Sequence, residues 1–205
     1  MSDKAAGHWD AVFASRDLDT VSWFEETPTH SVELLRAQPG SVIDIGAGAS
    51  RLPDALLADG REDITVLDIS NKALAVTRER LGSAERRVAY AVSDVLSWEP
   101  ARTYDAWHDR AVFHFLTAPA DQAAYVHLAA RALSPGGLLV LATFGPDGPT
   151  SCSGLPTARH SADDLAALLA PAFTLTHAEA RTHLTPAGAE QQFTWISARR
   201  TDDSR

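Results

Sequence analysis

Short apolar runs alternate with helical patterns along the chain. The runs typical of strands cover residues 41–45, 64–68, 88–92, 104–108, 138–143, 173–177 and 192–197. Helical spacing follows several of them, and Ser70 and Ser161 stand where helix N-caps are expected. Strands that alternate with helices predict βαβ units around a mostly parallel sheet. The last two runs are joined only by a turn-like segment at 185–188, which is too short for a parallel crossover, so we expect them to be antiparallel.

Two segments fall outside this alternation. Residues 1–25 are richer in tryptophan than in clear periodicity, and we expect them to cover the carboxyl edge of the sheet. Residues 145–160 read as a long loop of glycine, proline and serine. Loops that follow the carboxyl ends of strands build the ligand site in an open α/β sheet. The length of 205 residues suits a single domain over residues 1–205.

Composition and charge narrow the possible partners. Acidic residues outnumber basic ones by 27 to 18, which gives a net charge of −9 and makes nucleic acid a poor candidate. No run of about 18 apolar residues predicts a membrane helix, and the segment MSDKAAGHWD lacks the apolar core of a signal peptide, so we expect a cytoplasmic protein. Cys152 is the only cysteine, which excludes an intrachain disulfide and a cysteine-based zinc site. The eight histidines show no zincin spacing, and no metal is predicted.

Three acidic residues stand at the ends of the first three predicted strands. Asp44 precedes Gly46-Ala47-Gly48, where glycine lets the backbone approach a ligand. Asp68 follows one helix and one strand later, where a carboxylate can accept two hydrogen bonds from a ribose diol. Asp94 ends the third strand, where it could accept a hydrogen bond from an exocyclic amine. Each acid alone could be a cap or a turn former. Three in order on successive strands point to a nucleoside ligand.

The glycine loop discriminates between nucleosides. A dinucleotide fingerprint requires Gly-x-Gly-x-x-Gly, and Arg51 occupies its third glycine position. The phosphate-loop pattern is absent as well. A glycine loop without an evident phosphate site suits an adenosine ligand that carries no phosphates.

The motifs resemble those of class I S-adenosylmethionine-dependent methyltransferases. The matching segments are residues 42–48, 66–70, 93–95, 104–107 and 133–137. The chain departs from the common pattern at Ser50, where a third glycine is usual. The resemblance implies an α/β, Rossmann-like, open seven-stranded sheet with one antiparallel strand near an edge and helices on both faces. It also implies S-adenosylmethionine as cofactor and S-adenosylhomocysteine as product.

The same resemblance assigns roles to the cofactor residues. The loop from Asp44 through Gly46, Ala47 and Gly48 would face the methionine part. The ribose would lie at Asp68 and Ile69, and the adenine at Asp94 and the Val95 backbone. His108 is counted with this site.

The N-terminus is similar to a subgroup in which a Trp-Asp pair precedes a Ser-Trp-aromatic segment that covers the cofactor. Trp9-Asp10 and Ser22-Trp23-Phe24 match that pattern. Trp23 is the candidate for packing near the sulfonium, because an aromatic face favours a cation. An anchoring role in the core of the cover is the alternative.

Candidates for the acceptor chemistry follow the fourth strand and the last turn. Asp109 could orient or deprotonate an acceptor, and Arg110 could hold an anionic group. A structural ion pair between these two is the alternative. His183 is a second candidate base, set against a turn-stabilising role. We assign His114 to structure, and we expect Cys152 not to be catalytic.

We therefore predict S-adenosylmethionine-dependent methyl transfer to a small-molecule acceptor, through nitrogen, oxygen or sulfur. A protein-lysine methyltransferase is the first alternative, because the subgroup that the N-terminus resembles includes such enzymes. An NAD-linked oxidoreductase is disfavoured by Arg51. A non-catalytic cofactor-binding protein is the remaining alternative. A closed cavity under the cover would favour a small acceptor, and an acidic surface would favour a basic protein. The sequence does not define the oligomeric state.

Overall fold

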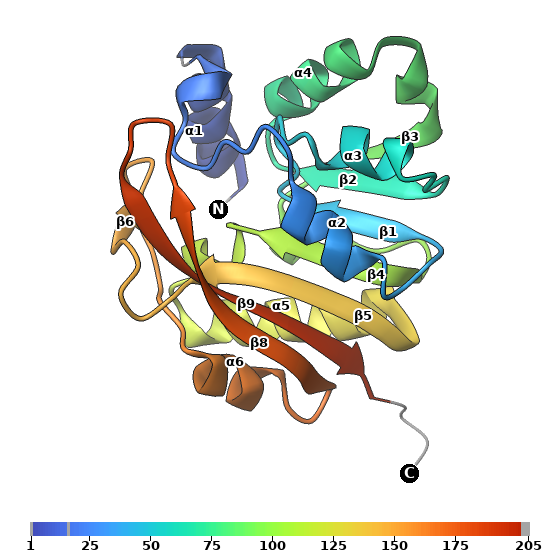
Figure 1. The fold of residues 1–205 in the computed structure, drawn as a ribbon, viewed down its shortest axis with the longest axis vertical. Coiled ribbons are helices and arrows are strands. Elements are labelled where there is room, and N and C mark those ends of the chain that lie inside the picture. The colour runs from blue at the N-terminus through green and yellow to red at the C-terminus, as the bar shows by residue number, and fades with distance from the viewer. Residues whose placement is uncertain (1, 16, 202–205) are drawn as a thin grey trace.

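The computed structural model describes residues 2–15 and 17–201, and within them a seven-stranded sheet forms the centre of the fold (Figure 1). The strands are β1 Val42–Ile45, β2 Ile64–Asp68, β3 Val88–Val92, β4 Tyr104–Arg110, β5 Leu133–Phe144, β8 Phe173–Leu184 and β9 Glu190–Arg200. Their order across the sheet is β3-β2-β1-β4-β5-β9-β8. Strands β1 to β5 pair in parallel, whereas β9 is antiparallel to both neighbours. The predicted fold class is confirmed, including the antiparallel strand next to the edge.

Helices lie on both faces of the sheet and at its carboxyl edge. The α-helices are α1 Ser2–Ser15, α2 Thr29–Leu35, α3 Leu52–Ala58, α4 Asn71–Leu81, α5 Pro119–Ala132 and α6 Ala162–Leu169. Short 3-10 turns are η1 Leu18–Thr20, η2 Gly82–Arg87, η3 Val95–Ser97 and η4 Phe113–Phe115. Ser70 caps α4 by accepting a hydrogen bond from the Ala73 amide, and Ser161 forms a capping box with Asp164 at α6.

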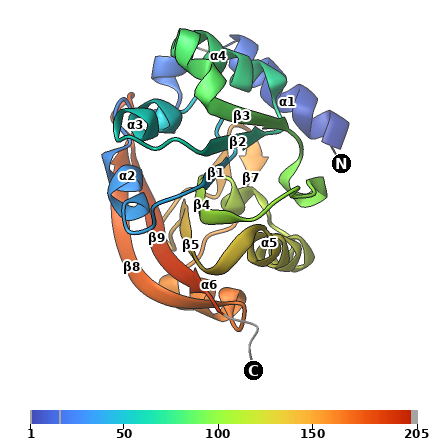
Figure 2. The same cartoon turned by 90° about the vertical axis from the view of Figure 1, so that its right-hand side faces the viewer.

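Two apolar cores result from the alternation of side chains along the strands. On β1, Val42 belongs to the core that α2, α3 and α4 cover, and Ile43 belongs to the core under α5 and α6. Figure 2 shows α2 and α3 on one side of the sheet and α5 on the other. β1 and β2 are buried on both faces, which explains why their sequences are almost continuously apolar.

The structure differs from the predicted elements mainly towards the C-terminus. β5 begins at Leu133 rather than 138, because Leu133 pairs with Tyr104 before the register shifts to Leu138 opposite Ala106. β8 and β9 form a hairpin of 12 and 11 residues, much longer than predicted, because the polar edge strand β8 has few apolar residues to mark its length. The loop at 145–160 carries the two-residue strands β6 Ser151–Cys152 and β7 Leu155–Pro156.

A membrane-spanning segment was not expected from the sequence. Within residues 2–15 and 17–201, no helix has both the length and the apolar character that crossing a bilayer requires.

Candidate active site

A cavity of about 700 Å³ lies at the carboxyl edge of the sheet. It is lined by the ends of β1, β2 and β4, by residues that follow β3, and by the N-terminal segment. The strand order reverses between β1 and β4, and open α/β sheets bind their ligands at such a switch point. All ten residues predicted for the cofactor line this one cavity, namely Trp23, Asp44, Gly46, Ala47, Gly48, Asp68, Ile69, Asp94, Val95 and His108.

The loop after β1 depends on two glycines. Gly46 has φ +62°, and a Cβ there would lie 2.0 Å from a methyl carbon of Val112. Gly48 has φ +52°, and a Cβ there would lie 3.1 Å from the Phe13 ring. Both positions therefore need the left-handed backbone and the missing side chain that glycine provides. The Ala47 amide donates to the Leu67 carbonyl, which ties the loop to β2.

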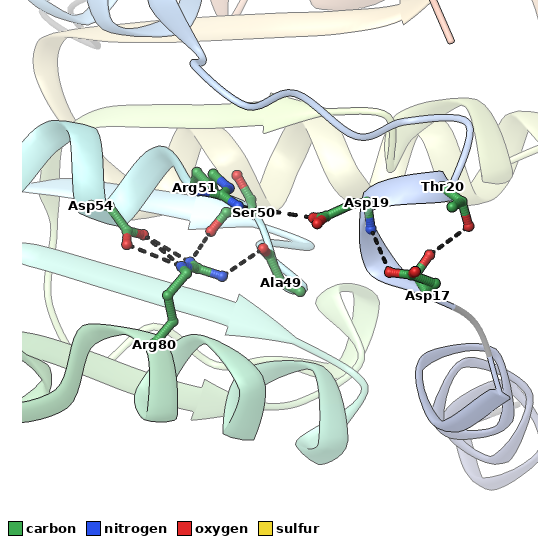
Figure 3. A network of polar contacts seen from close by, with 8 residues as sticks. All are labelled: Asp17, Asp19, Thr20, Ala49, Ser50, Arg51, Asp54 and Arg80. Atoms are coloured by element: carbon green, nitrogen blue, oxygen red, sulfur yellow. Dashed lines mark hydrogen bonds and ion pairs between the residues drawn. The ribbon is translucent and has the colours of Figure 1, made fainter. Parts of the chain in front are cut away.

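Arg80 holds the outer turn of this loop, where Ser50 replaces the usual third glycine. Its guanidinium donates to the Ala49 carbonyl at 2.9 Å and to the Ser50 carbonyl at 2.5 Å. Asp54 on α3 accepts hydrogen bonds from the same guanidinium. Figure 3 shows Arg80 on α4 with its contacts to Asp54 and to the loop. The turn is thus fixed by side chains from two helices.

Asp68 sits at the end of β2 with both carboxylate oxygens in use. The Gly48 amide donates to Oδ2 at 2.8 Å and the Ser70 amide to Oδ1 at 2.7 Å. Burial raises the pKa of Asp68 to about 6, although these two amides act in the opposite direction. The carboxylate lines the cavity, so its remaining lone pairs can accept from a ligand.

Asp44 is held by a buried chain of hydrogen bonds through His108 to Ser31. His108 on β4 contacts the Asp44 carboxylate through Nδ1 at 2.7 Å and the Ser31 hydroxyl through Nε2 at 3.0 Å. His108 is only 3% exposed, and both of its ring nitrogens are engaged. Its geometry therefore suits orienting Asp44 more than direct hydrogen bonding to a ligand.

The third acid, Asp94, follows β3. Asp94 accepts a hydrogen bond from the Leu96 amide at 3.0 Å and caps η3. It lines the cavity together with Ser93, Val95 and Leu96. Asp94 thus caps η3 and lines the cavity at the same time, and its contact with adenine stays a prediction.

The N-terminal segment forms one wall of the cavity. The Trp23 ring packs edge-on against Trp9 and Phe13, with centroid distances of 6.0 and 6.4 Å. The Ser70 hydroxyl donates to the Asp10 carboxylate at 2.6 Å, which joins α1 to the start of α4. We call residues 2–15 and 17–25 the cover.

Arg110 and His183 both bind the backbone of the cover. Arg110 donates to the Trp23 carbonyl at 2.9 Å and pairs with the Glu25 carboxylate at 3.2 Å. His183 Nε2 donates to the Ser22 carbonyl at 2.8 Å. Burial lowers the pKa of His183, and Arg110 lowers it further. Arg110 lines the cavity, whereas His183 is not among the lining residues. The geometry thus gives His183 a position behind the cover, in contrast to the acceptor-facing position expected from the sequence.

Asp109 lies on the opposite face of β4 from His108 and Arg110. Tyr125 donates its hydroxyl to Asp109 Oδ2 at 2.5 Å, and the Val112 amide donates to Oδ1 at 2.9 Å. Burial raises the pKa of Asp109 to about 6. The residue is fully buried and does not line the cavity. The structure therefore corrects the expected position of Asp109, because successive side chains of a strand point to opposite faces.

His114 in η4 is a residue whose position the sequence did not reveal. It borders the cavity, and its ring stacks on Phe144 at 4.1 Å with a 12° interplanar angle. Neither ring nitrogen has a hydrogen-bond partner within the described part of the chain. Burial lowers the pKa of His114 to about 3, and the charges of Arg110 and His160 act in the same direction. A lone histidine in an apolar segment carries no signal that separates this position from an ordinary core residue.

The remaining walls of the cavity are mostly apolar. They come from β5, the β6–β7 hairpin and β9, through Phe144, Cys152, Leu155, Pro156, Gln191 and Phe193. No group of three or more histidine, cysteine, aspartate or glutamate side chains in residues 2–15 and 17–201 is arranged to hold a metal ion.

Comparison with known proteins finds similarity to methyltransferases. Residues 42–137 match the family model described as a methyltransferase domain. The chain is 31% identical over 115 residues to malonyl-(acyl-carrier protein) O-methyltransferase from Halalkalibacterium halodurans, an alignment that covers 54% of this chain and 41% of the relative. The chain spans about two fifths of the length of the curated relatives it matches.

Two solved structures share the fold over nearly the whole chain. One, from work on the conversion of a disulfide bond into a thioacetal group during echinomycin biosynthesis, has a TM-score of 0.79 at 22% identity and covers 97% of this chain and 94% of its own. The other is the Burkholderia thailandensis 1,6-didemethyltoxoflavin-N1-methyltransferase with 1,6-didemethyltoxoflavin and S-adenosylhomocysteine, with a TM-score of 0.73 at 23% identity, covering 98% and 91%. Residues 42–137 are thus similar in sequence to methyltransferase domains, and the chain shares the fold of these solved structures.

Proposed function

We propose that this protein transfers a methyl group from S-adenosylmethionine to a small-molecule acceptor. The observation that carries the proposal is the continuity of the cavity. One part of the cavity is lined by Asp68 and Asp94, which stand at or just after the ends of β2 and β3. Another part is an apolar chamber lined by residues of β5 and β9. One covered space thus adjoins a nucleoside-binding set of acids and a second compartment that suits an acceptor.

In this proposal each cofactor residue binds a particular part of S-adenosylmethionine. Asp68 accepts hydrogen bonds from the ribose hydroxyls, and Asp94 with the Val95 backbone binds the adenine. The loop from Gly46 to Gly48 approaches the methionine part. The Asp44 carboxylate accepts a hydrogen bond from the ammonium group of that part. Trp23 lies in the wall of the same cavity, where an aromatic ring can stabilise the sulfonium.

Methyl transfer needs little covalent participation by the protein. The nucleophile displaces the thioether in line, so holding nucleophile, methyl carbon and sulfur together is the largest contribution. Arg110 is the charged side chain suited to an anionic part of the acceptor, because its Nε has no hydrogen-bond partner in the described residues. His183 contributes indirectly in this proposal, by holding the cover at Ser22.

A small acceptor fits the enclosure better than a lysine of a folded protein. The cover forms one wall of the cavity, and contacts of Arg110, His183 and Asp10 hold it at separate points. A protein substrate would have to thread a side chain past these contacts. The Burkholderia neighbour, which holds 1,6-didemethyltoxoflavin, is an example of a small acceptor on this fold.

The test is transfer of a labelled methyl group. The protein is incubated with methyl-labelled S-adenosylmethionine and either a panel of small phenols, amines and thiols or a lysine-rich histone. We expect label in at least one small acceptor, with equimolar S-adenosylhomocysteine, and none in the histone. Label in histone lysines alone would overturn the small-molecule assignment. Asp94→Ala serves as a variant with impaired cofactor binding, and should reduce labelling at limiting cofactor.

A further inference from the structure

His114 is held firmly in place while its polar atoms stay unused. The Ala158 amide donates to the His114 carbonyl at 2.7 Å, and the imidazole stacks on Phe144. The Phe115 ring makes a T-shaped contact with the imidazole, with a centroid distance of 4.4 Å. Backbone and ring are therefore fixed, yet neither ring nitrogen has a hydrogen-bond partner among residues 2–15 and 17–201.

A buried polar group without a partner is rare in native proteins, and a bound ligand is one reason for it. The charged or titratable groups that act on His114 are Arg110 and His160, and both disfavour protonation of the imidazole. The ring is therefore neutral at physiological pH. A neutral imidazole offers one N–H donor and one nitrogen acceptor.

The chamber around His114 is built for an apolar, aromatic ligand. Its walls include Trp9, Phe115, Phe144, Leu155, Pro156 and Phe193. Phe144 and Phe193 themselves form an edge-to-face pair, with centroids 4.9 Å apart. Offset and edge-on ring contacts of this kind suit a further aromatic ring. A hydrogen-bonding group on that ring would find its partner in His114.

We infer that His114 is a specificity-determining residue, whose neutral imidazole selects an aromatic acceptor that carries a hydroxyl or a ring N–H group. The inference rests on the proposed function, since the ligand it describes is the methyl acceptor. It assigns His114 to recognition of the acceptor, and it leaves the cofactor contacts unchanged.

The experiment is a calorimetric comparison of matched probes on the complex with S-adenosylhomocysteine. The probes are 2-naphthol, naphthalene and 2-methoxynaphthalene, which share one ring system and differ in the hydroxyl group. We expect the wild type to prefer 2-naphthol over naphthalene, and His114→Phe to lower that preference by roughly 5- to 150-fold, the range for one hydrogen bond to a buried group. His127→Phe, on the exposed side of α5, is the matched control and should behave like the wild type.

Each outcome is decisive for the inference. If the wild type and His114→Phe prefer 2-naphthol over naphthalene to the same extent, the inference is overturned. It is also overturned if the wild type binds neither 2-naphthol nor naphthalene. If His114→Phe fails to fold, the wild type alone still tests the need for a hydroxyl donor on the ligand. 2-Methoxynaphthalene lacks that O–H group and should bind more weakly than 2-naphthol. Equal binding of these two would again overturn the inference. Failure to bind S-adenosylhomocysteine in the first step would instead refute the proposed function.

Discussion

Asp68→Asn removes one negative charge at the centre of the proposed cofactor site while it keeps the size of the side chain. In the wild type the carboxylate accepts from two backbone amides and faces the cavity. An asparagine can accept through only one of its two terminal atoms. The substitution therefore removes the acceptor for one ribose hydroxyl, or leaves the Gly48 or Ser70 amide without a partner.

The expected loss follows from the worth of a charged hydrogen bond. Such a bond contributes about 1.5–3 kcal/mol, which corresponds to about 10- to 150-fold in affinity. The pH dependence gives a second signature. Because burial raises the pKa of Asp68 to about 6, the carboxylate becomes protonated as the pH falls through 6. Ribose hydroxyls donate to the ionised form, so wild-type affinity should be constant above pH 7 and fall below pH 6, by up to about tenfold per pH unit.

Calorimetric titration with S-adenosylhomocysteine from pH 5 to pH 8 measures both effects. The Asp68→Asn variant should bind weakly and show little pH dependence over this range. Asp94→Ala is the comparison, and we expect a smaller loss because the Val95 backbone remains. The reasoning is refuted if a folded Asp68→Asn variant binds as tightly as the wild type, or if both show the same fall in affinity below pH 6.

Three further substitutions test other parts of the account. Arg110→Gln should free the cover from β4, so amides of residues 20–25 should exchange hydrogen faster by mass spectrometry; unchanged exchange would exclude the fastening role. Arg80→Ala removes the hydrogen bonds to two carbonyls of the glycine loop and should raise the Kd for S-adenosylhomocysteine by about 5- to 150-fold; an unchanged Kd would mean that the loop holds its shape without Arg80. Asp109→Asn should lower the free energy of unfolding by about 1–3 kcal/mol in urea titrations, with cofactor affinity intact; a specific loss of turnover in a fully stable variant would restore Asp109 to the acceptor site.

The sequence predicts the sheet well where strands are buried on both faces. The boundaries of β2 agree with its apolar run, and the caps at Ser70 and Ser161 are confirmed. Only residues 173–177 of β8 were predicted from the sequence. The rest of this edge strand is polar, pairs on one side only and shows little apolar alternation. The apolar pattern thus marks the buried strand β2 and misses most of the exposed strand β8.

The candidate site divides along the same line. The acids proposed to bind the cofactor follow strand ends in order, so topology alone brings Asp44 and Asp68 to the same cavity. Asp109 could have been placed from the alternation of β4, because it cannot share a face with Arg110. His183 reaches the cover only because the β8–β9 hairpin is long. His114 takes its position at the cavity by stacking on Phe144, which lies on a different strand. Such contacts depend on tertiary packing, which no local pattern encodes.

The central claim is that the cavity binds an adenosine-containing methyl donor and not a dinucleotide. The most direct measurement is calorimetric titration of the wild-type protein with S-adenosylhomocysteine and, separately, with NAD. The account predicts one-to-one binding of S-adenosylhomocysteine and no detectable heat from NAD. Tight binding of NAD without binding of S-adenosylhomocysteine would contradict it.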